Sequence, residues 1–218
     1  MNFRILGICL LALAAPSTTF ADDFTTTLAK IQTDWAVANY AIKDSDLQAN
    51  AVAALSERTR AFVTANPNRA EALIWDGIVE STWAGASGGL SALRHAKQAR
   101  RQFEAALKID ASALDGSAYT SLGTLYHKVP GFPIGFGSKK KARQYLQKAL
   151  ELNPEGIDAN FFYAEYLLDQ GESAAAREHL QRGLRASDRP GRQLADEGRR
   201  AEIRSLLDNM GTKTKAGA

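Results

Sequence analysis

The sequence predicts an all-α protein, built as a helical solenoid of about nine helices in antiparallel pairs with a C-terminal capping helix. The first observation is that one pattern of small and large residues occurs twice, with the copies 34 residues apart. The two series are Ala142, Leu146 and Ala149, and then Ala176, Leu180 and Gly183. The second is that Gly and Ala recur where a large residue on one helix needs a small residue opposite it. The third is Pro154, which ends one helix pair and begins the next.

The period of 34 residues is that of the tetratricopeptide repeat (TPR). Before Ala142, the pair Leu122-Gly123 and the aromatic Tyr126 sit where the first helix of this repeat places such residues. In the next copy the corresponding places are taken by Tyr163, Ala164 and Leu167. The segment from Gly116 to Leu184 therefore resembles two TPR copies, and the fold class it implies is a TPR-like α-solenoid.

Helical spacing and helix-ending residues predict the other elements in chain order. The predicted helices cover residues 24–42, 47–65, 71–84, 90–109, 157–170, 173–186 and 192–210. Asp44-Ser45-Asp46 supplies the cap signals of the second helix, and Asn66-Pro67-Asn68 closes it. The separation of Gly77 from Ala99 is longer than in an ordinary TPR, and we expect the extra residues to lengthen the helix at 90–109 at its start.

Residues 1–21 have the pattern of a secretory signal peptide. Arg4 supplies the positive start, residues 5–15 form an apolar run too short to span a bilayer, and Thr19-Phe20-Ala21 is a small-x-small cleavage site. Cys9 follows a lipobox-like triplet, but cleavage there would leave almost no apolar segment before it. We therefore expect export to the periplasm, a solenoid domain at 22–210 and a flexible basic tail at 211–218.

Composition excludes several function classes. The 27 basic and 24 acidic residues nearly balance, which argues against a general nucleic-acid or membrane-surface binder. The single cysteine precedes Asp22, so the predicted mature chain has no disulfide, thiolate metal site or Cys nucleophile. No second apolar run is long enough to cross a membrane, so the protein is not expected to be membrane-embedded.

No catalytic, metal or cofactor signature is present, and we predict a non-enzymatic protein. His95, His127 and His179 lie in three different predicted helices without metal-ligand spacing. Ser121 lacks the strand-turn-helix setting of a hydrolase nucleophile. The Gly-rich run at 135–141 fails the phosphate-loop pattern. The Arg-rich region at 177–204 alternates with acidic residues and is interpreted as a solvated ion-pair face.

The segment Val129 to Ser138 interrupts the first repeat and carries our site hypothesis. Two prolines rule out a helix and three glycines permit tight turns, while its apolar residues indicate packing against something. We expect this loop to fold over the repeat stack and form an apolar mouth, with lysines at the following helix start attracting an anionic group. The candidate residues are Trp83, Tyr126, His127, Phe132, Phe136, Lys139, Lys140 and Lys141. The alternative is a structural loop with solvated lysines.

The insertions and this loop also resemble one exported TPR family. The motifs are the long helix after a Gly-rich break, Leu122-Gly123-Thr124-Leu125-Tyr126, Pro130-Gly131-Phe132-Pro133 and Gly137-Ser138-Lys139-Lys140-Lys141-Ala142. Over residues 68–186 they resemble the TatT-like T component associated with TRAP-type transporters. The resemblance implies a periplasmic all-α protein that partners a solute-binding protein, forms a homo-oligomer and surrounds a ligand-accessible cavity.

Function is therefore expected to be binding, with a protein partner and a small apolar or anionic ligand as the candidates. Two other classes stay open. One is an envelope assembly or scaffold factor that holds a peptide or protein in the TPR groove. The other is an enzyme whose site is assembled from dispersed residues.

Overall fold

The computed structural model describes the backbone of residues 19–216 and the side chains of residues 23–212. This part of the chain contains nine α-helices and one π-helical turn, and no β-strand. The helices are α1 (Thr19–Ala36), the π-helix η1 (Val37–Ala41), α2 (Ser45–Ala65), α3 (Ala70–Ala86), α4 (Gly89–Ile109), α5 (Ala113–Lys128), α6 (Lys139–Leu152), α7 (Ile157–Asp169), α8 (Ser173–Leu184) and α9 (Gln193–Ala216).

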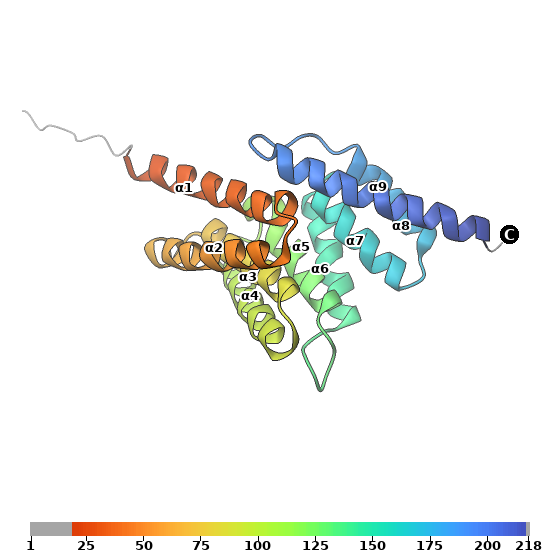
Figure 1. Cartoon of the computed structure of the whole chain (residues 1–218), viewed down its shortest axis with the longest axis horizontal. Helices are drawn as coiled ribbons and strands as arrows, with labels where there is room; N and C mark the ends of the chain where they lie inside the picture. The colour runs from red at the N-terminus through yellow and green to blue at the C-terminus, as the bar shows by residue number, and fades with distance from the viewer. Residues whose placement is uncertain (1–18, 217–218) are drawn as a thin grey trace, which may run out of the picture.

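Consecutive helices pack as antiparallel pairs, and the pairs stack along the molecule (Figure 1). The pairs α3–α4, α5–α6 and α7–α8 make the most extensive contacts, and the first helix of each pair also touches the first helix of the next. The all-α, TPR-like architecture predicted from the sequence is confirmed for the described residues. The lengthened second helix is confirmed as well, since α4 begins at Gly89 and has 21 residues.

Small residues permit close crossings within the pairs. A Cβ added at Gly123 in α5 would lie 2.5 Å from Leu146 Cγ in α6. A Cβ at Gly77 in α3 would lie 2.5 Å from the ring of Phe103 in α4. Leu146 and Phe103 are both completely buried, so each glycine accepts a large side chain from the partner helix. The predicted repeat register is therefore confirmed.

Helix α9 caps the repeat stack and also contacts the N-terminal helices. It packs on α7 and α8, and it also reaches η1 and α1 at the other end of the solenoid. Figure 1 shows α1 and α9 along the same side of the molecule. At this crossing the ring of Tyr40 occupies the place of a side chain at Gly198, where an added Cβ would lie 2.3 Å from Tyr40 Cδ1. The N-terminal helices and α9 thus meet across the inner face of the repeats.

Two helix ends differ from those predicted. The final helix does not end at Met210 before a flexible tail, because α9 continues to Ala216. The first helix begins at Thr19 and not at residue 24. Cleavage after Ala21 stays a prediction. The rest of the predicted signal peptide, residues 1–18, lies outside the described residues.

The crossing at Gly123 generates a stability prediction. Replacing Gly123 with Leu forces a large side chain into the space that Leu146 fills, and overpacking of this kind typically costs ~1–3 kcal/mol. We expect a clear fall in the free energy of unfolding, measured by denaturant titration. The control is Gly211→Leu in α9, because an added Cβ at Gly211 meets no atom within 4 Å. Equal stability of the two variants would contradict the repeat register.

Candidate functional site

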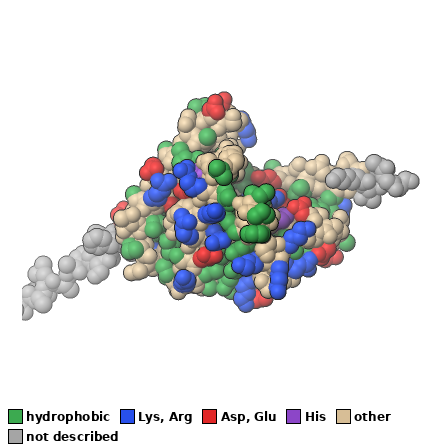
Figure 2. All heavy atoms as spheres, turned by 90° about the horizontal axis from the view of Figure 1, so that it is seen from below, with side chains coloured by type: hydrophobic (Ala, Val, Ile, Leu, Met, Phe, Trp, Pro, Cys, Tyr) green, Lys and Arg blue, Asp and Glu red, His purple; other side chains and the backbone are tan. Residues whose placement is uncertain are grey.

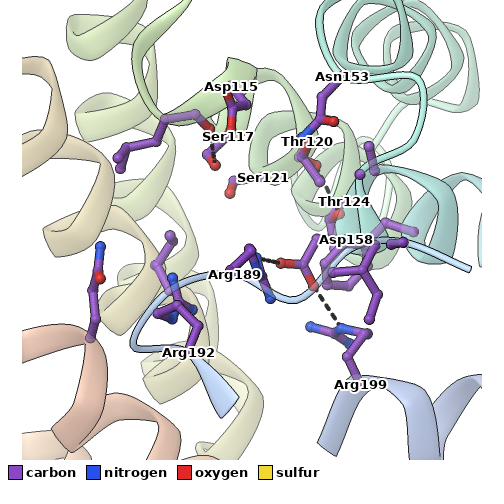
Figure 3. A pocket seen from close by; sticks show the side chains of 18 of the residues that line it. Asp115, Ser117, Thr120, Ser121, Thr124, Asn153, Asp158, Arg189, Arg192 and Arg199 are labelled. Carbon is purple, nitrogen blue, oxygen red and sulfur yellow. Dashed lines mark hydrogen bonds and ion pairs between the residues drawn. The ribbon is translucent and has the colours of Figure 1, made fainter. Parts of the chain in front are cut away.

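A cavity of about 470 Å³ lies on the inner face of the solenoid. The first helices of the pairs, α3, α5 and α7, form one side, and α1 contributes Gln32 and Trp35. The segment at 186–192, together with Arg199 from α9, forms the opposite wall. Figure 3 shows the labelled polar side chains of these elements around a common space. The closure of the solenoid by its two ends therefore turns an open concave face into a pocket.

Helix α5 lines this pocket with hydroxyl groups. Ser117 and Ser121 are four residues apart, as are Thr120 and Thr124, which places the four hydroxyl groups on one side of the helix. Ser117 donates to the carbonyl of Leu114 at 2.7 Å, and Thr124 donates to the carbonyl of Thr120 at 2.9 Å. The hydroxyl of Ser121 has no partner among the described residues. This wall can accept and donate hydrogen bonds without carrying charge.

The chain enters α5 through an unusual turn. Leu114, Asp115 and Gly116 all have left-handed backbone angles, with φ of 50°, 55° and 74°. Gly adopts this region freely, whereas each non-Gly residue there costs of order 1–3 kcal/mol. Leu114 and Asp115 both line the pocket. The strained residues thus lie at the candidate site, as such residues often do.

A partly buried ion-pair cluster holds the two walls of the pocket together. Asp158 at the start of α7 accepts from Arg189 Nη1 at 2.7 Å and from Arg199 Nε at 2.8 Å. Arg189 also donates from Nε to Asp196 Oδ1 at 2.7 Å. Only 8% of the Arg199 side chain is exposed, and it also pairs with Glu202. The cluster joins α7 to the segment after α8 and to α9 (Figure 3).

The charge state of this cluster follows from its geometry. Burial alone would raise the pKa of Asp158, but the guanidinium groups of Arg199 and Arg189 outweigh it and hold that pKa well below its ordinary value. Burial would lower the pKa of Arg199, and the carboxylate of Asp158 reverses that effect. All three groups are therefore ionised at neutral pH.

Arg192 is the arginine of the 186–192 wall that lacks an ion pair. Its guanidinium lies over the ring of Trp75, with Cζ 4.9 Å from the ring centroid. Burial lowers its pKa, and the positive charge of Arg189 acts in the same direction. Its Nε and the indole Nε1 of Trp75 are both buried without an acceptor among the described residues. Both residues line the pocket.

The residues of the sequence-based site hypothesis are only partly brought together. Tyr126 is buried, and its ring meets Phe136 edge-on, with centroids 5.5 Å apart. Lys141 Nζ lies 5.0 Å from the Tyr126 ring centroid, and Arg100 of α4 covers Phe136. Figure 2 views the face on which the loop projects, where basic side chains flank hydrophobic ones. Lys139 and Lys140 are exposed on the first turn of α6.

The predicted apolar mouth is wrong. Phe132 is 94% exposed, and the loop projects from the stack instead of folding over it (Figure 1). His127 faces α7, where its Nε2 lies 2.7 Å from Asp169 Oδ2. Trp83 stacks on His95 with ring centroids 4.1 Å apart. The reason is that Gly137 and Gly135 close the base of the loop through backbone hydrogen bonds to Pro130 and Gly131, which direct its tip outward.

A second buried polar cluster between α2, α3 and α4 was not anticipated. Asp76 accepts from Thr59 Oγ1 and from Gln102 Nε2, both at 2.6 Å. Burial raises the pKa of Asp76. Glu80 accepts from Ser56 Oγ at 2.6 Å and from His95 Nδ1 at 2.7 Å. These bonds outweigh the effect of burial and lower the pKa of Glu80.

The interpretation of residues 177–204 as a solvated ion-pair face is wrong for its central part. Arg199 is 7% exposed and Asp196 is 1% exposed, and both belong to the cluster at Asp158. A signal for this was present in the sequence. Counting back from the inward residue Ile203 in steps of four, three and four gives Arg199, Asp196 and Arg192, so the inner face of α9 extends into a charged segment.

Comparison with known families supports the repeat assignment. The family model described as Tetratricopeptide repeat matches residues 137–196, which contain α6, α7, α8 and the start of α9. No curated protein matches the sequence. Within residues 19–216, no helix has both the length and the apolar character needed to cross a membrane. The described residues also contain no group of three or more His, Cys, Asp or Glu side chains placed to hold a metal ion.

The Asp158 cluster generates a prediction about stability and pH. Asp158→Asn leaves Arg199 buried beside a neutral group, and we expect a loss of about 2–3 kcal/mol in the free energy of unfolding. Because the folded-state pKa of Asp158 is depressed, its contribution is present above the unfolded pKa of about 3.9 and is lost as pH falls through the folded pKa. Stability should thus fall less steeply on acidification in the variant.

Asp34→Asn is the matched control for this measurement. The Asp34 and Asp158 side chains are both 32% exposed, but Asp34 pairs with Arg58, whose side chain is 44% exposed. An exposed pair of this kind contributes about 0–1 kcal/mol. Urea titrations of both variants between acidic and neutral pH provide the comparison. Losses of similar size would show that the Asp158 cluster does not hold the pocket walls together.

Proposed function

We propose that this protein is a binding module that holds a segment of a partner protein in the pocket on its inner face. The observation that carries the proposal is the pocket itself, formed by the first helices of three repeat pairs and closed by α1 and the 186–192 segment. Its volume of about 470 Å³ lies in the range of specific ligand sites. TPR solenoids bind partners on such concave surfaces and are typically non-catalytic.

The setting we propose is the periplasm, with a solute-binding protein of a TRAP-type transporter as the partner. The support is the signal-like N-terminal sequence and the resemblance of the loop and insertion motifs to the TatT-like T component. An envelope assembly factor is the alternative, and it would use the same pocket for a different polypeptide. The projecting loop offers a second contact surface, because Phe132 is 94% exposed and Ile134 is 70% exposed.

The proposal is tested by capture that depends on the pocket. The tagged protein is expressed in its host, cross-linked and purified, and the bound proteins are identified by mass spectrometry. Ser121→Trp places a large side chain into the pocket from α5, so we expect loss of the specific partner. The control is Gln144→Trp, which adds the same side chain at an exposed position of α6.

Each outcome of the capture experiment has a distinct meaning. A partner that the control retains and Ser121→Trp loses, while both variants stay folded by circular dichroism, supports the pocket as the binding site. A partner retained by both contradicts the proposal. Replacing Lys139, Lys140 and Lys141 with Gln, at two salt concentrations, separates the loop surface from the pocket, because only the loop contact depends on those charges.

The proposed export predicts the N-terminal residue of the mature protein. We expect the protein purified from its host to begin at Asp22, because the apolar run at 5–15 and the small residues before Asp22 match a cleavable signal peptide. Intact-mass measurement of the periplasmic and cytoplasmic fractions decides this. A protein that retains Met1, or that carries a lipid on Cys9, would contradict periplasmic export by a cleaved signal peptide.

A further inference from the structure

Two unpartnered hydrogen-bond donors lie against each other in the pocket. Four buried side-chain nitrogen atoms in the described residues have no acceptor, and two of them belong to Trp75 and Arg192. Trp75 is 2% exposed, so its indole N–H has lost water on folding without gaining a protein acceptor. The neighbouring Trp35 differs, because its Nε1 donates to Thr82 Oγ1 at 2.8 Å.

The same wall shows why Arg192 is available for a ligand. Arg189 and Arg199 both pair with Asp158, and Arg200 pairs with Asp188 at 2.7 Å. No carboxylate pairs with the guanidinium of Arg192 among residues 23–212, and its stacking on Trp75 holds it in place. The pocket thus contains one guanidinium that has no carboxylate of the described residues at ion-pair distance, held beside a neutral donor.

We propose that Arg192 and Trp75 form the recognition site for a carboxylate group of the ligand that enters this pocket. A carboxylate carries one negative charge and two acceptor oxygens, which matches one unpaired guanidinium and one indole N–H. A phosphate dianion fits less well, because its second charge would have no second unpaired guanidinium and would share the pocket with the carboxylate of Asp115. The hydroxyl of Ser121 on the facing helix is a further neutral donor.

This inference rests on the proposed binding function and specifies the chemical group that the pocket recognises. The carboxylate has two sources, the C-terminus of a polypeptide or a free organic acid of small size. Both use the same two donors, so the test includes a probe of each kind. Each probe is paired with its uncharged amide, which has nearly the same size and shape and lacks only the negative charge.

The experiment uses the indole N–H signals of the ¹⁵N-labelled protein in solution. The chain has three tryptophans, and Trp75→Phe identifies the signal of Trp75. The probes are hexanoate with hexanamide, and a pool of N-acetylated tetrapeptides with free C-termini with the same pool amidated. We expect the acid of at least one pair to move the Trp75 signal downfield, as hydrogen bonding does, and the matched amide to bind about tenfold or more weakly.

Variants of Arg192 test the charge. Arg192→Gln should weaken binding of the acid probe by about tenfold or more, to the level of the amide. Arg192→Lys keeps the charge but loses the planar fork, so its affinity should lie between the two. Arg204→Gln is the control, because it removes one positive charge from an exposed site of α9, the helix that follows Arg192. Circular dichroism checks that each variant is folded.

The possible results separate the two proposals. Acid-specific binding that Arg192→Gln abolishes and Arg204→Gln retains supports the carboxylate site, and the probe that binds identifies the source. Equal binding of acid and amide, or unchanged binding in Arg192→Gln, overturns it while leaving the pocket as a partner site. If the Trp75 signal responds to no probe at millimolar concentration, the carboxylate proposal is also overturned. The proposed partner binding is tested separately, by the effect of Ser121→Trp on capture.

Discussion

The pocket depends on the ion-pair cluster centred on Asp158. One carboxylate at the start of α7 binds Arg189 from the segment after α8 and Arg199 from α9. The same C-terminal region contacts the N-terminal helices through the stacking of Arg192 on Trp75 and through the crossing of Tyr40 and Gly198. A solenoid whose repeats contact only their neighbours has no inherent reason to close. Here the ion pairs fix the C-terminal region on α7, in a position from which it contacts the N-terminal helices and closes the pocket.

The sequence predicted the repeat fold because the fold rests on local spacing. Gly123 against Leu146 and Gly77 against Phe103 are contacts between adjacent helices, and the periodicity of each helix encodes them directly. The pocket is different. It joins Trp75 of α3 to Arg192, which is far away in the chain, and no periodicity relates the two positions. Among the residues of the pocket region, only those on the inner face of α9 could be found from helical spacing. They are charged, so the sequence analysis assigned them to the solvent.

The loop hypothesis used the rule that a broken local preference marks function. Three lysines at the start of α6 do break the helix-dipole preference. The structure provides a packing role for one of them, because Lys141 lies over the ring of Tyr126 and its Nζ is 3.5 Å from the Tyr126 hydroxyl. Lys139 and Lys140 remain exposed, at a small cost that solvent screening allows. Binding by this surface stays a prediction, and its apolar tip is the feature that favours it.

The Asp76–Glu80 cluster and the Trp75–Arg192 site differ in whether their buried polar groups have hydrogen-bond partners. In the cluster around Asp76 and Glu80, each carboxylate oxygen accepts from a neighbouring side chain, so the cluster can fix the packing of α2, α3 and α4 but has nothing left to bind. At Trp75 and Arg192 the donors are fixed and the acceptors are missing. A buried donor without a partner costs about 1–3 kcal/mol, which is a poor arrangement for stability alone. The Trp75–Arg192 site bears this cost, whereas the Asp76–Glu80 cluster avoids it. Binding of a ligand with acceptor atoms is the simplest physical reason for the unpaired donors at Trp75 and Arg192.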